Sequence, residues 1–188
     1  MSPIAHAELG WLLAVPVARD RRERIWGAVA GVLPDLDGLT LAAYPWDHGD
    51  AFARWHHLLT HGALAAAGVT LIAVIASPRG ARLRTGGIAL ASFHLHLLCD
   101  LMGSGQGWPI AYLWPLSEHM TAPFRWGWAL ASWQNMAIAV GTSFAILGVG
   151  VWRGHTVVEL FSARYDAVFV QVLRIWRARL RGAGAKPS

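Results

Sequence analysis

Histidine and aspartate side chains recur in this sequence at spacings typical of metal ligands. His6 precedes an apolar stretch, His57 and His61 stand four residues apart, and His96 and Asp100 repeat that spacing. Each group lies at an end of a hydrophobic segment, where a bare imidazole or carboxylate near lipid is costly. Imidazole nitrogens and carboxylate oxygens bind zinc and other divalent ions, so we expect these residues to hold a metal.

The central histidines fit a helix. His57 and His61 would share one helix face, where both imidazoles can reach a single ion. The alternative is a pair of interfacial histidines in a tryptophan-rich segment. His56 points elsewhere on such a helix, so at most one of His56 and His57 shares an ion with His61, and the sequence leaves open which.

Two aspartates lie in the segment 33–38, which reads LPDLDG. Pro34 ends a helix, and a glycine closes the turn that follows. Alternate residues of an extended turn can point the same way. Asp35 and Asp37 could therefore both bind metal, or one could bind while the other orients a histidine. Ordinary turn chemistry is the alternative.

His96 and Asp100 lie one helical turn apart in an otherwise apolar segment. An aspartate there has to be neutralised or paired, and a metal ion does so more completely than a neutral histidine. The alternative is a hydrogen-bonded His–Asp couple without metal. His94 falls on a different helix face, where we expect it to pack or to support a ligand.

The composition indicates which scaffold holds these groups. The 188 residues are 55% hydrophobic and 14% charged and include 11 Trp, which predicts an all-α integral membrane helical bundle. Cys99 is the single cysteine, so a cysteine-based zinc site is excluded. The net charge of +5 does not indicate nucleic-acid binding, because the arginines flank apolar segments.

Apolar segments of suitable length predict three to five membrane-embedded helices. Residues 129–152 form an almost uncharged run that can cross a hydrocarbon core of about 30 Å. The segments 61–76 and 86–102 are shorter predicted spans, and 4–18 and 25–33 are predicted to form a hairpin of two short helices.

Basic residues set the orientation, because basic loops stay cytoplasmic. The segments 19–24, 79–84 and 153–186 contain 14 of the 16 basic residues, which leaves Arg54 and Arg125 for the other side. This asymmetry predicts a multi-pass protein of a bacterial inner membrane, with the N-terminus outside and the C-terminus in the cytoplasm. The candidate site residues at or near the outer face are then His6, Asp35, Asp37, His56, His57, His61, Asp100, Glu118 and His119.

The order of these motifs carries a resemblance. Residues 1–100 resemble the LexA-regulated inner-membrane family of metal-dependent hydrolases. The matching features are an N-terminal histidine (His6), a G-x-L-P-D-x-D element (31–37), an H-x-x-x-H segment (57–61), and an H-x-x-x-D helix (96–100) followed by Gly103 and the turn Trp114-Pro115.

That family is in turn similar to the zinc-dependent phospholipase C and nuclease group, whose helical fold gathers several zinc ions. The resemblance implies a divalent metal, with zinc first and manganese as the alternative. Around the central pair the family usually reads H-R-G-x-T-H-S, whereas residues 56–62 here read HHLLTHG. The implied ligands are His6, Asp35 or Asp37, His57 or His61, His96, and Asp100, which would be able to bridge two ions.

The predicted function is that of a membrane-bound metal-dependent hydrolase, because a divalent metal lowers the pKa of bound water from about 15.7 toward 7. A site at the bilayer boundary suggests a phosphoester that is lipid-linked or amphipathic. Asp37 is the candidate general base or orienting group, and Glu118 and His119 are candidates for delivering a proton to the leaving group. A non-catalytic metal carrier or sensor is the alternative. A haem-binding electron carrier would leave the aspartates unexplained.

The chain is predicted to have three parts. Residues 1–155 form the membrane-embedded hydrolase domain. From Val157, apolar residues recur at three- and four-residue steps among arginines, so 156–181 are predicted to be a basic amphipathic helix on the cytoplasmic leaflet with membrane lipid as its partner. A helix that binds a protein partner is the alternative. Residues 182–188 are predicted to be a disordered tail.

Overall fold

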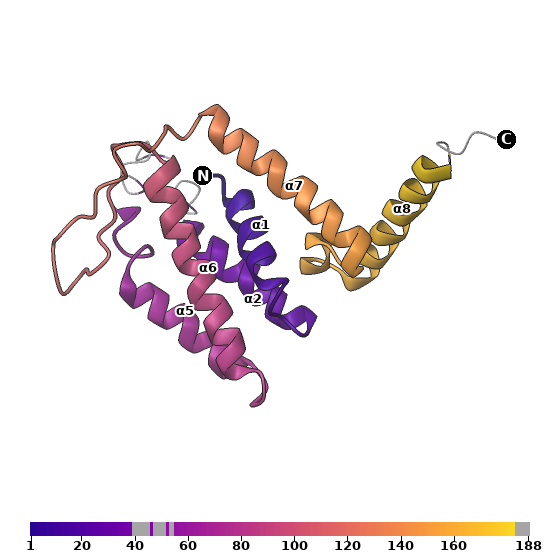
Figure 1. The fold of residues 1–188 in the computed structure, drawn as a ribbon. Helices are drawn as coiled ribbons and strands as arrows, with labels where there is room; N and C mark the ends of the chain where they lie inside the picture. Colours follow the sequence, from indigo (N-terminus) through magenta and orange to yellow (C-terminus); the bar gives the residue numbers. More distant parts are fainter. Residues whose placement is uncertain (39–45, 47–51, 53–54, 183–188) are drawn as a thin grey trace. The chain divides into compact units, whose positions relative to one another are not determined.

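The computed structural model describes residues 1–38, 46, 52 and 55–182; Arg54 and the predicted tail from residue 183 onward lie outside them. Apart from one isolated bridge between Ile110 and Thr121, the regular elements of this part of the chain are helices, which confirms the all-α prediction there (Figure 1). The α-helices are α1 (Pro3–Ala14), α2 (Arg21–Val32), α5 (Ala63–Ala76), α6 (Arg82–Gly103), α7 (Trp133–Arg153) and α8 (Ala163–Gly182), and the 3-10 helices are η1 (Leu33–Gly38) and η3 (Val157–Leu160).

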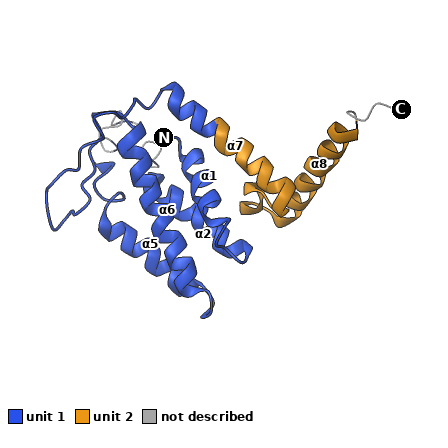
Figure 2. Ribbon diagram, in the orientation of Figure 1, with its two compact units in different colours: residues 1–139 blue, residues 140–188 orange. Residues whose placement is uncertain are grey.

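The chain forms two compact units that divide within α7, one of residues 1–139 and one of residues 140–188 (Figure 2). The first unit contains α1, α2, η1, α5 and α6, and therefore all the predicted metal ligands. The predicted division at residue 155 concerns function and stays a prediction.

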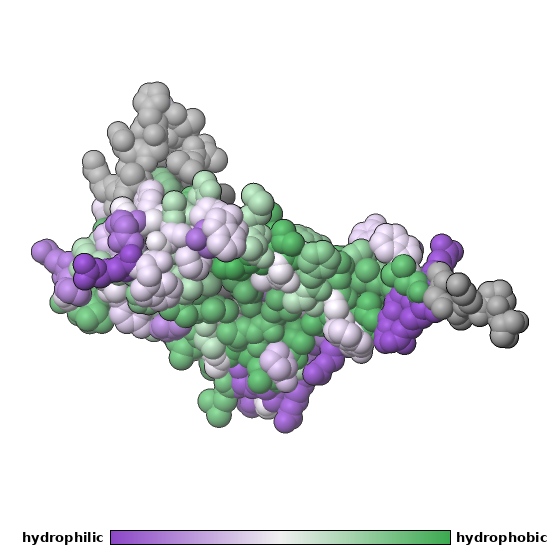
Figure 3. Space-filling view, turned by 45° about the horizontal axis from the view of Figure 1, so that its top comes forward, coloured by the Kyte–Doolittle hydropathy of each residue, from purple (hydrophilic) through white to green (hydrophobic). Residues whose placement is uncertain are grey.

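Two helices of the described chain, α6 and α7, are long and apolar enough to cross a membrane, judged by length and composition. α5 is apolar but has only 14 residues, about 21 Å at 1.5 Å per residue. The count of three to five embedded helices therefore stays a prediction. Apolar side chains cover much of the face seen in Figure 3. The exposed apolar side chains of the described residues include Ile72 of α5 and Phe144 of α7.

The hairpin of α1 and α2 packs backbone against backbone through glycines. A Cβ atom at Gly27 would come 2.5 Å from the Gly10 carbonyl oxygen and 2.7 Å from the Ala14 Cβ. A Cβ at Gly31 would come 2.6 Å from the His6 carbonyl oxygen. Only glycine allows this approach, which brings the N-terminal turn of α1 beside the C-terminal end of α2.

An ion pair between a partly exposed arginine and a buried glutamate fixes α2 against α6. Glu23 is 1% exposed, and the Arg84 guanidinium donates through Nε to both of its carboxylate oxygens, at 2.9 and 3.0 Å. The backbone N–H of Arg19 donates to the same carboxylate at 2.6 Å. The contact with Arg84 lowers the pKa of Glu23, so the carboxylate stays charged although it is buried. This pair sets the register of the two helices.

In the C-terminal unit, the start of the last helix differs from the prediction. The predicted amphipathic helix from Val157 is broken, because η3 ends at Leu160 and α8 begins at Ala163. Asp166 explains the break: its Oδ1 accepts hydrogen bonds from the backbone N–H of Thr156 at 2.9 Å and from the Thr156 hydroxyl at 2.5 Å. These bonds fold the chain back before α8 starts.

We predict that Gly27→Ala destabilises the first unit by about 1–3 kcal/mol, because the new methyl group meets backbone that cannot move aside cheaply. The measurement is thermal unfolding of the detergent-solubilised protein. Gly87→Ala is the matched control, because a Cβ at Gly87 has nothing within 4 Å and alanine favours the helix. Equal unfolding temperatures for the two variants would contradict the close helix packing.

Candidate metal centre

Four segments bring histidine and aspartate side chains to one buried centre. These histidines and aspartates are almost fully buried, with exposed fractions from 0% for His61 to 3% for Asp100. Asp35 is the exception, because its side chain is 13% exposed. Such burial of a polar cluster is costly unless the groups satisfy one another or a ligand. The contributing residues are His6 from α1, Asp35 from η1, His57 and His61 from the turn before α5, and His96 and Asp100 from α6.

Four donor atoms form a cage. The Nε2 atoms of His61 and His96 are 3.1 Å apart, and Asp100 Oδ2 lies 3.5 and 2.9 Å from them. Asp35 Oδ1 is 3.9 Å from His61 Nε2 and 3.7 Å from His96 Nε2. Ligands at 2.0–2.1 Å from a tetrahedral ion lie about 3.3 Å apart, so this cage could hold one divalent metal after small adjustments. The four donor atoms lie within 4.8 Å of one another.

The histidines use their outer ring nitrogens to hold this orientation. His96 Nδ1 lies 2.8 Å from the Gly31 carbonyl oxygen, and His57 Nδ1 lies 3.1 Å from that of Trp108. A carbonyl can only accept, so each Nδ1 carries the proton and each Nε2 keeps its lone pair. Metal-binding histidines are oriented in this way.

The Nδ1 atom of His61 also carries the proton, and its hydrogen-bond acceptor is a hydroxyl group. Its Nδ1 lies 3.0 Å from Thr60 Oγ1, which itself donates to Asp37 Oδ2 at 2.9 Å. Because the Thr60 hydroxyl donates its proton to Asp37, its oxygen accepts a hydrogen bond from His61 Nδ1. The Nε2 atom of His61 therefore also keeps a lone pair. Two lone pairs 3.1 Å apart, on His61 and His96, repel each other unless a cation lies between them.

The two carboxylate oxygens of Asp100 have different surroundings: Oδ1 accepts hydrogen bonds from neighbouring groups, and Oδ2 faces the cage. Oδ1 accepts from the Ser104 hydroxyl at 2.9 Å and from the Met1 amino nitrogen at 3.1 Å, and it lies 3.2 Å from His6 Nε2. Oδ2 faces the cage and makes no hydrogen bond with the described residues, although His96 Nε2 is near. Asp35 Oδ2 and His57 Nε2 are buried without a hydrogen bond as well. A buried polar atom left in this state costs about 1–3 kcal/mol, which a bound cation would remove.

A second group of possible ligands adjoins the first. His56, His57 and His61 form it, and His61 belongs to both groups. The structure thus brings both His56 and His57 to the centre, where the sequence left open which of the two takes part. His57 Nε2 lies 3.7 Å from Asp100 Oδ2, which places Asp100 beside both groups.

The predicted helix around these histidines is wrong. Residues 56–62 form turns and bends, and His57 has a φ of 66°, in the left-handed region. That conformation costs a non-glycine residue about 1–2 kcal/mol, and such strain is found where a side chain must be aimed. The four-residue spacing brings the rings of His57 and His61 to 4.4 Å, but through a tight turn.

Asp37 lies behind the cage. His56 Nδ1 donates to its carboxylate at 2.9 Å, and Thr60 donates to the same oxygen. Burial would raise the pKa of Asp37, but the hydrogen bond from His56 and the one from Thr60 outweigh burial and lower it. These hydrogen bonds would let Asp37 orient His56 and Thr60, and its predicted role as orienting group, general base or ligand stays a prediction.

Burial shifts the pKa values of two further groups, Asp35 and His57, which lie outside the candidate spans. It raises the pKa of Asp35 to about 6. It lowers the pKa of His57 to about 3, helped by the neighbouring His61 and His56. A neutral His57 is the form that can bind metal.

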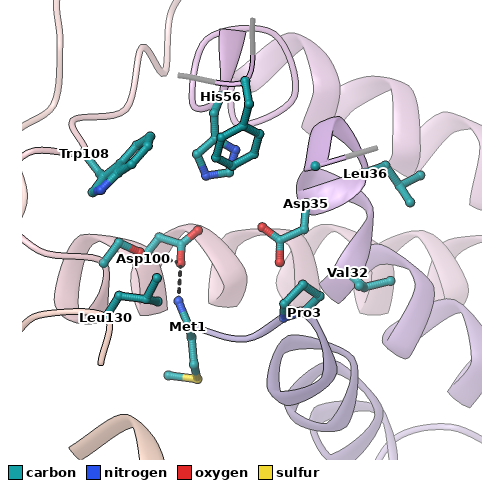
Figure 4. Close-up of a pocket in the computed structure, with 12 residues that line it drawn as sticks. Met1, Pro3, Val32, Asp35, Leu36, His56, Asp100, Trp108 and Leu130 are labelled. Carbon is teal, nitrogen blue, oxygen red and sulfur yellow. Dashed lines mark hydrogen bonds and ion pairs between the residues drawn. The ribbon is translucent and has the colours of Figure 1, made fainter. Parts of the chain in front are cut away.

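A cavity of about 470 Å³ opens beside the cage (Figure 4). The carboxylates of Asp35 and Asp100 face each other across it, and His56 lies above them. Of the described residues that line it, none is arginine or lysine. The rest of the wall is mainly apolar and includes Val32, Leu36, Phe52, Trp108 and Leu130.

Glu118 and His119 are exposed and are not among the described residues that line this cavity. Their part in proton delivery stays a prediction. Thr60 and Ser104 are supporting residues that the sequence reasoning missed. Ser104 stands four residues after Asp100, directly after the end of α6, and this spacing could have revealed it.

Comparison with known proteins identifies one family. Residues 1–176 match the family model described as YdjM inner membrane protein. Neither a curated protein nor a solved structure matches the chain. The matched range includes every residue of the candidate metal centre.

We predict that His96→Ala lowers the metal affinity of the purified protein by at least ~100-fold, because a ligand matters no less than the groups that support it. Bound zinc and manganese are measured by elemental mass spectrometry after dialysis. His94→Ala is the matched control, since His94 lies on the same helix and its Nε2 bonds to the Tyr112 hydroxyl. Full metal content in the His96 variant would remove this residue from the site.

Proposed function

We propose that this chain, which belongs to the YdjM inner membrane protein family, uses its buried histidine and aspartate cluster as the metal centre of a membrane-bound phosphoester hydrolase. The observation that carries the proposal is the cage of His61, His96, Asp35 and Asp100, whose donor atoms turn inward beside a cavity. Structural zinc sites are closed, whereas catalytic sites keep a position open for water or substrate. The cavity offers that open side.

The residues of the centre fit a divalent ion, because the donors are nitrogen and oxygen and several are buried without a hydrogen bond to any described residue. Bound there, zinc or manganese would lower the pKa of a water molecule and offset negative charge on a phosphoryl group. The four cage residues would hold the ion. Asp100, close to both ligand groups, is the candidate to serve two ions.

Two groups on the cavity wall are placed to move protons. Asp35 lines the cavity, and its Oδ2 makes no hydrogen bond with the described residues, so with Oδ1 turned to the cage this second oxygen would be left to accept a proton from water. His56 lines the same cavity and donates through Nδ1 to Asp37, so its Nε2 is left to exchange a proton with a bound substrate. We therefore assign Asp37 the task of orienting His56.

The cavity wall supports an amphipathic substrate. Its surface is mainly apolar, which suits an acyl or isoprenoid chain, while the polar end carries Asp35, His56 and Asp100. No arginine or lysine lines the described wall, and the Met1 amino group on it is already paired with Asp100, so bound metal would balance the charge of a phosphate. A lipid-linked phosphoester meets both conditions.

We predict that the zinc-loaded or manganese-loaded protein hydrolyses a phosphodiester, and that Asp100→Asn lowers kcat/KM by at least ~100-fold. The assay uses bis-p-nitrophenyl phosphate and a short-chain lipid phosphodiester in detergent. His94→Ala serves again as the control, and the lipid substrate should show the lower KM. A wild type that binds metal fully but hydrolyses neither compound would be a metal carrier or sensor.

The arginine distribution supports a centre on the outer side of the membrane, with the C-terminus in the cytoplasm. We predict that a fluorescent or phosphatase reporter fused after Ser188 registers as cytoplasmic. A periplasmic signal from that fusion would reverse the proposed orientation and place the centre on the inner side.

A further inference from the structure

The C-terminal unit contains a second cavity, unrelated to the metal centre. It measures about 290 Å³ and is lined by Val151 of α7 and by Arg174, Arg177, Ala178 and Arg181 of α8. The three arginines stand at positions i, i+3 and i+7, so they share one face of α8. We call this cavity the arginine cleft.

Contacts within the C-terminal unit shape the arginine cleft. Asp166 binds Thr156 and turns the chain back, and Leu173 packs into the space left by Gly150, where a Cβ would come 3.0 Å from it. Gly154 has a φ of +81°, and a Cβ there would come 2.9 Å from Arg174 Nη2. Glycine at this position thus allows the turn and also leaves room for the guanidinium group.

The cleft concentrates positive charge. Of the described residues that line it, none is acidic. The two carboxylates of η3 and α8, Glu159 and Asp166, are buried, and Asp166 is bonded to Thr156. Three guanidinium groups on one helix face repel one another, so a bound anion would lower their energy. Guanidinium groups bind phosphate with two parallel hydrogen bonds, which makes phosphate the best-fitting anion.

The position of the cleft identifies the source of the phosphate. Val151 lies in the last turn of α7, a helix that is long and apolar enough to span a membrane and that ends at Arg153. Lipid headgroups begin where an apolar span ends. Trp152 is 74% exposed at the same level, and exposed tryptophans are typical of the membrane interface.

We propose that the arginine cleft binds the phosphate of an anionic phospholipid headgroup in the leaflet at the C-terminal end of α7. The site is independent of the proposed hydrolase function. It would tie α8 to that leaflet, and it would select anionic over zwitterionic lipids because the described lining residues carry no carboxylate to pair with a choline or amine group.

The test uses the full chain in a neutral detergent, titrated with dioctanoyl phosphatidylglycerol, dioctanoyl phosphatidylcholine or inorganic phosphate. Binding is followed by isothermal calorimetry. We expect phosphatidylglycerol to bind at least ~10-fold more tightly than either of the others. The variant with Arg174→Gln, Arg177→Gln and Arg181→Gln should lose at least ~10-fold of that affinity.

A charge-matched control carries Arg153→Gln, Arg164→Gln and Arg179→Gln, which removes the same net charge outside the cleft lining. It should stay within about 2-fold of the wild type. Equal losses in both variants would show diffuse attraction and overturn the site. Equal affinity for inorganic phosphate and the lipid would overturn the lipid assignment. A third variant with lysine at the three cleft positions keeps the charge, so it controls for folding and should bind more weakly than wild type but better than the glutamine variant.

Discussion

A carboxylate buried at the end of an apolar helix is the constraint around which the first unit is arranged. Asp100 is 3% exposed, and such a charge must be surrounded by donors or cations. Its Oδ1 is held by Ser104 and the Met1 amino group, while its Oδ2 faces the nitrogens of His61 and His96. α1, the turn before α5 and α6 each supply a partner for this one side chain, namely His6, His61 and His96.

Helix packing and site geometry depend on each other through backbone contacts. Gly31 lets α2 approach α1 at His6, and the Gly31 carbonyl also receives the Nδ1 proton of His96. The close glycine contacts thus supply the acceptor that fixes the His96 ring. Farther along the same helices, the ion pair between Glu23 and Arg84 sets the register that brings this acceptor to the right level of α6.

Much of the scaffold could be predicted from the sequence. Apolar runs predicted the helices around 86–102 and 129–152 to within a few residues, and the spacing of His96 and Asp100 predicted their proximity because a helix turn requires it. The turn at His57 could not be predicted this way, since a spacing of four serves a helix and a tight turn equally. The bond from His57 to the Trp108 carbonyl joins residues 51 positions apart, and no local pattern encodes such a contact.

The cage residues come from distant parts of the chain, and this determines when the metal centre can form. The donors come from η1, from the turn before α5 and from α6, and they meet only after these segments have docked. With the proposed ion, the last cage ligand along the chain would be Asp100 in α6, so metal capture would follow the docking of η1 and the turn before α5 against that helix. A chain in which one of these segments had not docked would lack a complete set of donor atoms.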